Sequence, residues 1–124
     1  KGFSTESIAR KCGSLSKAFL SSTFPEIGTG FERKAFEGVA SKVKLCRYGM
    51  DAYAYALLAT GHLDIVVEAG LKSYDVQAPI AVIEAAGGIM TDWKGGPATN
   101  GGRVLACGDE LVHKIALEML SINI

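Results

Sequence analysis

Apolar and polar residues alternate along the chain in two patterns, one typical of helices and one typical of strands. Between Phe31 and Val43 the apolar residues recur three or four positions apart, which predicts an amphipathic helix. Leu63 to Glu68 is instead a nearly continuous apolar run, which predicts a central strand covered on both faces. The whole pattern predicts strands over residues 18–24, 44–47, 63–68, 89–93 and 103–107, and helices over 31–43, 51–60, 76–86 and 109–120.

Glycine and aspartate mark the expected ends of these elements. Gly61 follows the second helix and Gly87-Gly88 follows the third, as expected of residues that end helices. Asp109 is expected to cap the last helix with its side chain. A turn is expected over residues 25–30. The alternation of strands and helices predicts an α/β architecture.

Composition narrows the class of protein. The chain has 124 residues, enough for one domain with its own core, and is 48% apolar and 21% charged. Thirteen basic residues balance thirteen acidic ones, which argues against a nucleic-acid or membrane-surface partner. No apolar run approaches the roughly 20 residues of a membrane span. Three dispersed cysteines predict free thiols in a reducing compartment, hence a cytoplasmic protein.

Two aspartates each stand at the start of an expected helix, and each allows two interpretations. The carboxylate of Asp75 or Asp51 could cap its helix by accepting a backbone hydrogen bond. Alternatively, Asp75 could bind a divalent cation, because Mg²⁺ takes few protein carboxylates and shares its shell with phosphate and water. Asp51 could instead face the same cleft and bind a cationic group of a substrate.

Other candidate residues are less specific. Glu68 ends an apolar strand, where α/β proteins form ligand clefts, although a solvated charge is the simpler interpretation. Arg47 could pair with an acid or a substrate anion, or lie free on the surface. His62 and His113 lie far apart and are expected to be structural. Neither a Gly-x-Ser-x-Gly elbow nor a Walker phosphate loop occurs.

Taken together, several short motifs resemble the C-terminal half of the inositol monophosphatase family. These motifs are Gly49, Ala59-Thr-Gly61, Asp64, Glu68-x-Gly70, Tyr74-Asp-Val76 and Glu84-Ala-Ala-Gly-Gly88. Within the family, the chain is most similar to histidinol-phosphate phosphatases of the bacterial and plant type. That similarity is carried by residues 47–75, 91–96 and 101–106, with departures at Met50 and Pro79.

The resemblance implies a fold and the need for an N-terminal half that is absent from this sequence. The implied fold has a mixed β-sheet flanked by helices and is the C-terminal half of an αβαβα layered sandwich, spanning residues 1–124. The family's Asp-Pro-x-Asp-Gly-Thr metal-binding loop belongs to its N-terminal half and is absent here. The first residue is Lys1 rather than methionine. We therefore expect a piece of a longer enzyme that is inactive without its N-terminal half, and the family makes a homodimer plausible.

The resemblance also implies residue roles. It assigns Mg²⁺ binding to Asp75 and contact with the alcohol part of a phosphorylated small molecule to a strip of neighbouring residues. The implied substrate-binding residues are Arg47, Gly49, Met50, Asp51, Glu68 and Asp75. The carboxylate of Asp51 favours the ammonium group of histidinol phosphate, because charge-assisted hydrogen bonds are strong. The implied activity is Mg²⁺-dependent hydrolysis of that ester in histidine biosynthesis; the alternatives are an inositol or broad sugar-phosphate phosphatase and a non-catalytic binding module.

Overall fold

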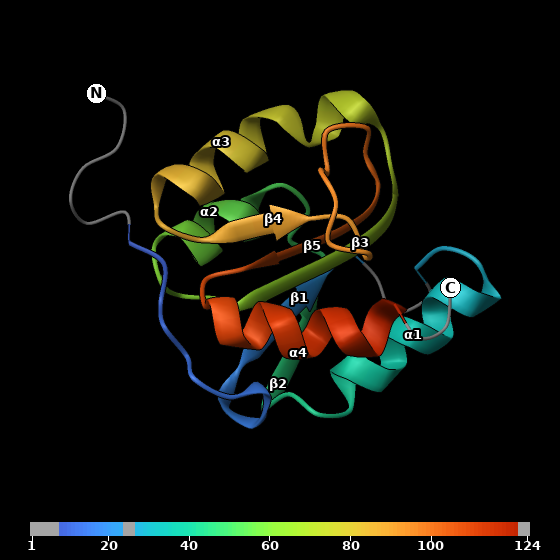
Figure 1. Ribbon diagram of the computed structural model, residues 1–124, viewed down its shortest axis with the longest axis horizontal. Coiled ribbons are helices and arrows are strands. Elements are labelled where there is room, and N and C mark those ends of the chain that lie inside the picture. Colours follow the sequence, from blue (N-terminus) through green and yellow to red (C-terminus); the bar gives the residue numbers. More distant parts are fainter. Residues whose placement is uncertain (1–7, 24–26, 122–124) are drawn as a thin grey trace.

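The computed structural model describes residues 8–23 and 27–121. Within these residues the strands form one five-stranded mixed sheet in the order β2-β1-β3-β5-β4 (Figure 1). β1, β2 and β3 run parallel, and β5 is antiparallel to both β3 and β4. The predicted α/β class with a mixed sheet is confirmed. The strands are β1 (Phe19–Ser22), β2 (Leu45–Tyr48), β3 (Ile65–Leu71), β4 (Ile89–Thr91) and β5 (Gly102–Cys107).

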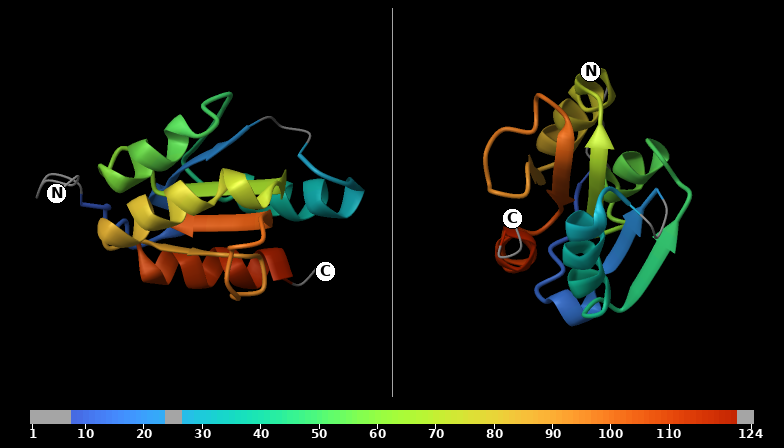
Figure 2. Two further views of the ribbon diagram at one scale, coloured as in Figure 1. Left: turned by 90° about the horizontal axis from the view of Figure 1, so that it is seen from above. Right: turned by 90° about the vertical axis from the view of Figure 1, so that its right-hand side faces the viewer.

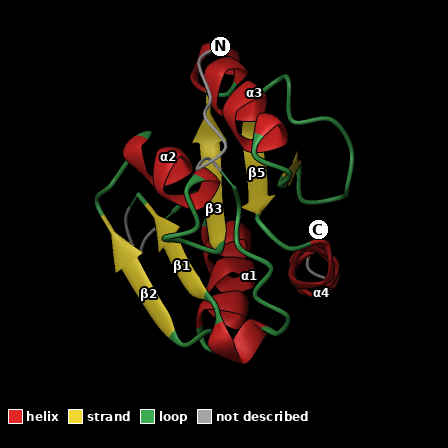
Figure 3. Cartoon of the chain, turned by 90° about the vertical axis from the view of Figure 1, so that its left-hand side faces the viewer, coloured by secondary structure: helices red, strands yellow, loops and turns green. Residues whose placement is uncertain are grey.

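Helices cover both faces of the sheet (Figures 2 and 3). The second and third pack against one face, and the first and last against the other. Residue 24 of the first predicted strand and residues 25 and 26 of the predicted turn lie outside the described residues. The helices are α1 (Gly30–Ala40), α2 (Tyr53–Ala59), α3 (Gln77–Ala85) and α4 (Glu110–Ser121), with short 3₁₀ turns η1 (Leu15–Lys17) and η2 (Ser73–Asp75).

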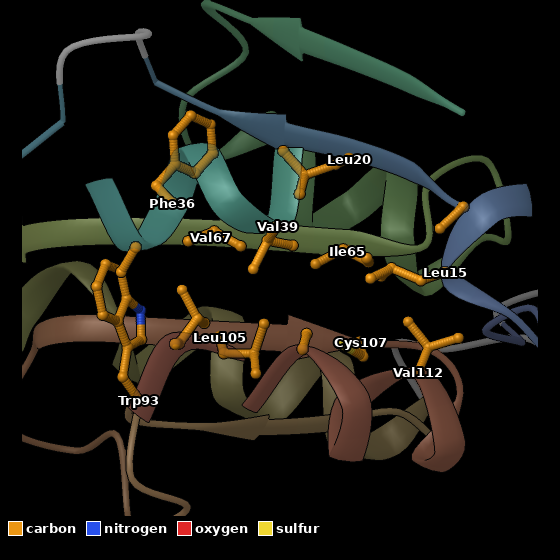
Figure 4. Packing of buried hydrophobic residues seen from close by; sticks show 14 of the residues in the cluster. Leu15, Leu20, Phe36, Val39, Ile65, Val67, Trp93, Leu105, Cys107 and Val112 are labelled. Atoms are coloured by element: carbon orange, nitrogen blue, oxygen red, sulfur yellow. The ribbon is translucent and has the colours of Figure 1, made fainter. Parts of the chain in front are cut away.

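β3 contributes to the cores on both sides of the sheet, which confirms the prediction of a central, doubly covered strand. Ile65 and Val67 pack towards α1 and α4, whereas Val66 packs towards α2 and α3. Figure 4 shows the first of these cores, where Leu20 and Leu105 from neighbouring strands join them. Alternate residues of one strand thus pack into two separate apolar cores, because successive side chains point to opposite faces of a sheet.

Backbone hydrogen bonds fix the helix ends close to their predicted positions. The predicted cap at Asp109 is confirmed, since its Oδ1 accepts from the backbone N–H of Leu111 at 2.8 Å. α3 ends as its sequence predicts: Gly88 N–H donates to the Ile83 carbonyl at 2.9 Å and Gly87 N–H to the Glu84 carbonyl at 3.1 Å, the pattern of a Schellman motif.

A short segment before η1 is bonded to Asp64, the residue directly before β3. The guanidinium of Arg10 donates from Nε to Oδ1 and from Nη2 to Oδ2 of Asp64, each at 2.8 Å. Asp64 also accepts from the Phe19 N–H at 2.8 Å. The three cysteines are free thiols, as predicted. Among the described residues, no helix combines the length and apolar character needed to cross a bilayer.

Candidate functional site

A cleft lies near the carboxyl ends of the parallel strands. Thr23 follows β1, Asp51 follows β2, and Glu68 lies in the second half of β3. Asp75, at the end of η2, also lines the cleft. Carboxyl ends of parallel strands lie at one edge of a sheet, so residues distant in sequence meet there. The cleft encloses about 430 Å³ and is lined by Thr23, Ile27, Gly28, Asp51, Ala52, Tyr55, Glu68, Ala69, Gly70, Leu71 and Asp75.

Asp51 reaches the cleft through a tight loop between β2 and α2. Gly49 has φ +84°, and its N–H donates to the Thr23 carbonyl at 2.8 Å, so the chain turns back over the end of β1. Asp51 itself has φ +49°, a left-handed conformation that aspartate tolerates better than most residues. The interpretation of Asp51 as a helix cap is wrong, because α2 is preceded by Ala52 at the cap position and has no side-chain cap.

Glu68 is the buried acid of the cleft. Only 3% of the residue is exposed, and its Oε2 accepts a hydrogen bond of 2.7 Å from the Thr23 hydroxyl. Burial raises the pKa of Glu68; the hydrogen bonds from Thr23 lower it, and the charge of Asp51 raises it further. The simpler interpretation of Glu68 as a solvated strand end is therefore wrong, and its proton is held more tightly than that of a surface glutamate.

Asp75 is an exposed acid of the cleft, as is Asp51. Its Oδ2 accepts a 3.0 Å hydrogen bond from the Lys72 N–H, which closes η2. The interpretation of Asp75 as the cap of α3 is wrong, because Val76 occupies that position and no side-chain cap is present. The carboxylate reaches back to Lys72 instead, since η2 places it one residue too early to cap α3.

The other predicted substrate-binding residues lie outside the lining of the cleft. Arg47 is exposed on the edge strand β2. Gly49 supplies the turn described above, and Met50 is half-buried against the core beneath α2 and α3. Contact of these three residues with a substrate stays a prediction. Gly49 makes the turn that precedes Asp51, and the Met50 carbonyl accepts a 3.0 Å hydrogen bond from the Tyr53 N–H.

The cleft carries negative charge without a basic side chain in its described lining. Its three acids are Asp51, Glu68 and Asp75, and the remaining lining residues are neutral. Like charges in a partly desolvated space repel one another, and a bound cation relieves that repulsion. Such a cleft therefore attracts cations.

A hard cation such as Mg²⁺ fits part of this arrangement. Asp75 supplies an exposed carboxylate oxygen ligand of the kind that Mg²⁺ prefers. However, the described residues contain no group of three or more potential ligands able to hold a metal ion. Asp75 could supply one ligand, and the described residues do not provide a complete set.

Sequence reasoning missed Thr23 and Tyr55 as parts of the site. Both line the cleft, and Thr23 bonds directly to Glu68. The sequence alone favours packing over recognition for the pair Tyr53 and Tyr55, with Tyr53 as the one close enough to Asp51 to border a pocket. A signal was nevertheless present, since a tyrosine on a buried helix face needs a partner for its hydroxyl where phenylalanine would not.

The chain is similar in sequence and in structure to several known proteins. Residues 5–121 match the model of the inositol monophosphatase family. Over 120 residues the chain is 44% identical to the bifunctional phosphatase IMPL2, chloroplastic, of Arabidopsis thaliana, and the match covers 90% of this chain. An inositol monophosphatase from Zymomonas mobilis is 37% identical, with a TM-score of 0.87 over 92% of this chain. The extragenic suppressor protein suhB from Bartonella henselae is 25% identical, with a TM-score of 0.79 over 94% of this chain.

The chain is shorter than each of these relatives. It covers 35% of the Arabidopsis protein. It covers 46% of the Zymomonas chain and 47% of the Bartonella chain. The matched region thus corresponds to less than half of each of these three proteins.

Proposed function

The chain belongs to the inositol monophosphatase family, and from this premise we propose that it forms the substrate-binding half of a Mg²⁺-dependent phosphatase whose preferred substrate is histidinol phosphate. The observation that carries the proposal is the acidic cleft at the ends of the parallel strands, with Asp51, Glu68 and Asp75 in its wall. A phosphate ester can lie beside three carboxylates only when cations neutralise the charge. A metal ion and a substrate ammonium group are such cations.

Asp51 supports the choice of an amino alcohol as substrate. Its carboxylate lies in the cleft lining, and its charge raises the pKa of Glu68, so the two acids are electrostatic neighbours. A positively charged group between Asp51 and Glu68 would relieve this repulsion, whereas a neutral polyol would leave it in place. An ammonium group on the alcohol part of the ester therefore suits this wall.

Different acids of the cleft would bind the metal and the alcohol. Asp75 would hold the metal from its exposed position after η2, while Glu68 and Asp51 would bind and orient the alcohol. When bound, Mg²⁺ supplies charge neutralisation at the phosphate and lowers the pKa of a water. Thr23 fixes the carboxylate of Glu68 through its 2.7 Å hydrogen bond, which keeps that acid in one orientation.

The proposal includes the rest of the enzyme. Because the described residues supply no complete metal site, we expect residues 1–124 to be inactive alone and to require an N-terminal half that completes the metal ligands. We expect the assembled enzyme to be a homodimer. A second candidate function, hydrolysis of inositol or other sugar phosphates, is favoured by the similarity to the Zymomonas inositol monophosphatase.

A comparison of substrates tests the proposal. The full-length enzyme would be assayed with Mg²⁺ on histidinol phosphate and on inositol 1-phosphate, and kcat/KM compared before and after Asp51→Ala. We expect histidinol phosphate to be preferred, and we expect the variant to lose most of that preference while it keeps activity on inositol phosphate. A preference for inositol phosphate, or a preference that Asp51→Ala leaves intact, would overturn the choice of substrate in favour of the second candidate.

A further inference from the structure

The hydroxyl of Tyr55 is buried in the wall of the cleft and has no hydrogen-bond partner among the described residues. The residue is 5% exposed, lies on α2 among the core residues of that helix, and lines the cleft. Its phenol oxygen makes no hydrogen bond to any described residue. Buried polar groups are nearly always paired, so an orphan of this kind calls for an explanation.

Packing explains the ring of Tyr55 but not its hydroxyl. A phenylalanine would fill the same space beside Leu58 and would avoid the unfavourable burial of an unpaired hydroxyl. Tyr53, two residues earlier, shows the contrast, because its ring is 65% exposed and its hydroxyl is free to meet water. The Tyr55 hydroxyl is therefore suited to a ligand that enters the cleft.

The charges around Tyr55 define what that hydroxyl can do. Burial raises the pKa of Tyr55, and the carboxylates of Glu68 and Asp75 raise it further, so the phenol keeps its proton. An ionised carboxylate only accepts hydrogen bonds, and the proton of the Thr23 hydroxyl is already donated to Glu68. Among the side chains in the described lining, Tyr55 is thus the uncommitted hydrogen-bond donor.

We propose that the Tyr55 hydroxyl donates a hydrogen bond to an acceptor atom on the alcohol part of the substrate. The inference rests on the proposed function and deepens it. The carboxylates bind the donors of the substrate, such as an ammonium group, and Tyr55 binds an acceptor, such as a ring nitrogen or a hydroxyl oxygen. The cleft therefore suits alcohols that carry both kinds of group. Tyr55 acts as a substrate-positioning residue and leaves the phosphate to the metal-binding side.

The test compares Tyr55→Phe with Tyr53→Phe in the full-length enzyme, since both changes remove one phenol oxygen from the same helix. One neutral hydrogen bond corresponds to a change of about 3- to 10-fold in affinity. We expect Tyr55→Phe to raise KM for the best substrate by that factor and to leave inhibition by inorganic phosphate unchanged. Tyr53→Phe should change neither. An amino-alcohol phosphate that has neither a ring acceptor nor a free hydroxyl should bind the wild type and Tyr55→Phe equally.

The melting temperature separates this role from a structural one. Tyr55→Phe should keep or raise the melting temperature, because it removes an unpaired buried group. A fall in melting temperature with unchanged KM would overturn the inference and assign the hydroxyl to folding. An equal rise in KM for the analogue without either acceptor would also overturn it.

Failure of the proposed substrate is a separate outcome. If inositol phosphate is the better substrate, the same comparison of KM is made with that ester. If neither ester is hydrolysed, calorimetric binding of histidinol and myo-inositol replaces KM. Equal binding of both alcohols by the wild type and Tyr55→Phe would then overturn the inference.

Discussion

The hydroxyl of Thr23 donates a 2.7 Å hydrogen bond to Oε2 of Glu68 and so joins the end of β1 to the middle of the neighbouring strand β3. The bond places a buried carboxylate at the point where the sheet opens into the cleft. Two opposed influences act on Glu68: removal from water raises its pKa and the Thr23 hydrogen bonds lower it. Removal from water dominates, and the resulting pKa is raised.

The raised pKa makes stability depend on pH in a defined direction. Between the ordinary value of 4.5 and the raised value, the folded protein binds more protons at Glu68 than the unfolded protein does. The contribution of this group to the free energy of unfolding is therefore present at low pH and is lost as pH rises through that window. Glu68→Gln removes the titration. Urea unfolding from about pH 4 to about pH 8 should show the variant gaining stability relative to wild type as pH rises.

Thr23→Val supplies the control for this effect. It removes the hydrogen bond that lowers the pKa of Glu68, so the window in which stability is lost should extend to higher pH. A stability difference between Glu68→Gln and wild type that does not change with pH would contradict the assignment.

Asp75→Asn should weaken binding of Mg²⁺ by the full-length enzyme. The substitution removes the negative charge but keeps an oxygen that can accept from the Lys72 N–H, so the turn η2 should persist. Calorimetric titration with Mg²⁺ should show a loss of more than about tenfold, the scale seen even for groups that only support a ligand. Glu84→Gln removes an exposed charge from α3, outside the described lining of the cleft, and serves as the matched control. Unchanged affinity in Asp75→Asn would favour the non-catalytic module.

The ion pair between Arg10 and Asp64 should stabilise the folded protein, so the effects of replacing the two residues should not be additive. Asp64 is 1% exposed and also accepts from the Phe19 N–H, so its loss would leave a backbone donor unpaired at the start of β1. We expect Asp64→Ala, which removes both carboxylate oxygens, to lower the free energy of unfolding by roughly 1.5–3 kcal/mol. A double-mutant cycle with Arg10→Gln should give a coupling energy within about 0.5–3 kcal/mol. Strictly additive effects would show that the contact is incidental.

Two glycine substitutions should have opposite signs. A Cβ on Gly88 would lie 2.8 Å from the Cys107 carbonyl oxygen and 3.0 Å from Cγ2 of Ile83, so Gly88→Ala should destabilise the fold by about 1–3 kcal/mol. Gly38 lies inside α1 with nothing near the position of its Cβ, so Gly38→Ala should stabilise it by about 0.4–1 kcal/mol. Thermal unfolding of the two variants decides, and a loss of stability in both would contradict this geometry.

The pattern of the sequence predicted the elements well because burial imposes periodicity. The helix with apolar residues every three or four positions became α1, and the continuous apolar run became the doubly covered β3. Asp109 was predicted as a cap because it directly precedes the last helix, and its hydrogen bond to the Leu111 N–H confirms this. Such features depend on neighbours in the sequence, so they can be read without knowledge of the fold.

The roles of individual cleft residues depended on contacts between distant segments. Asp75 and Asp51 were possible caps by position, but a 3₁₀ turn and a left-handed residue placed their carboxylates elsewhere. The family resemblance brought Asp51, Glu68 and Asp75 together correctly in one cleft. It gave no indication of Thr23, because that hydrogen bond exists only once β1 and β3 are adjacent.

The left-handed backbone of Asp51 creates a trade-off at a single position. Glycine would adopt φ +49° without the steric penalty of roughly 1 kcal/mol that a side chain incurs there. A change to glycine would therefore make the protein more robust while it erased the feature that, under the proposed function, selects a charged alcohol over a neutral one. Directed evolution that selects only for thermal tolerance should therefore favour glycine at residue 51. Under the proposed function, the resulting variants would unfold at a higher temperature and distinguish less well between charged and neutral alcohols.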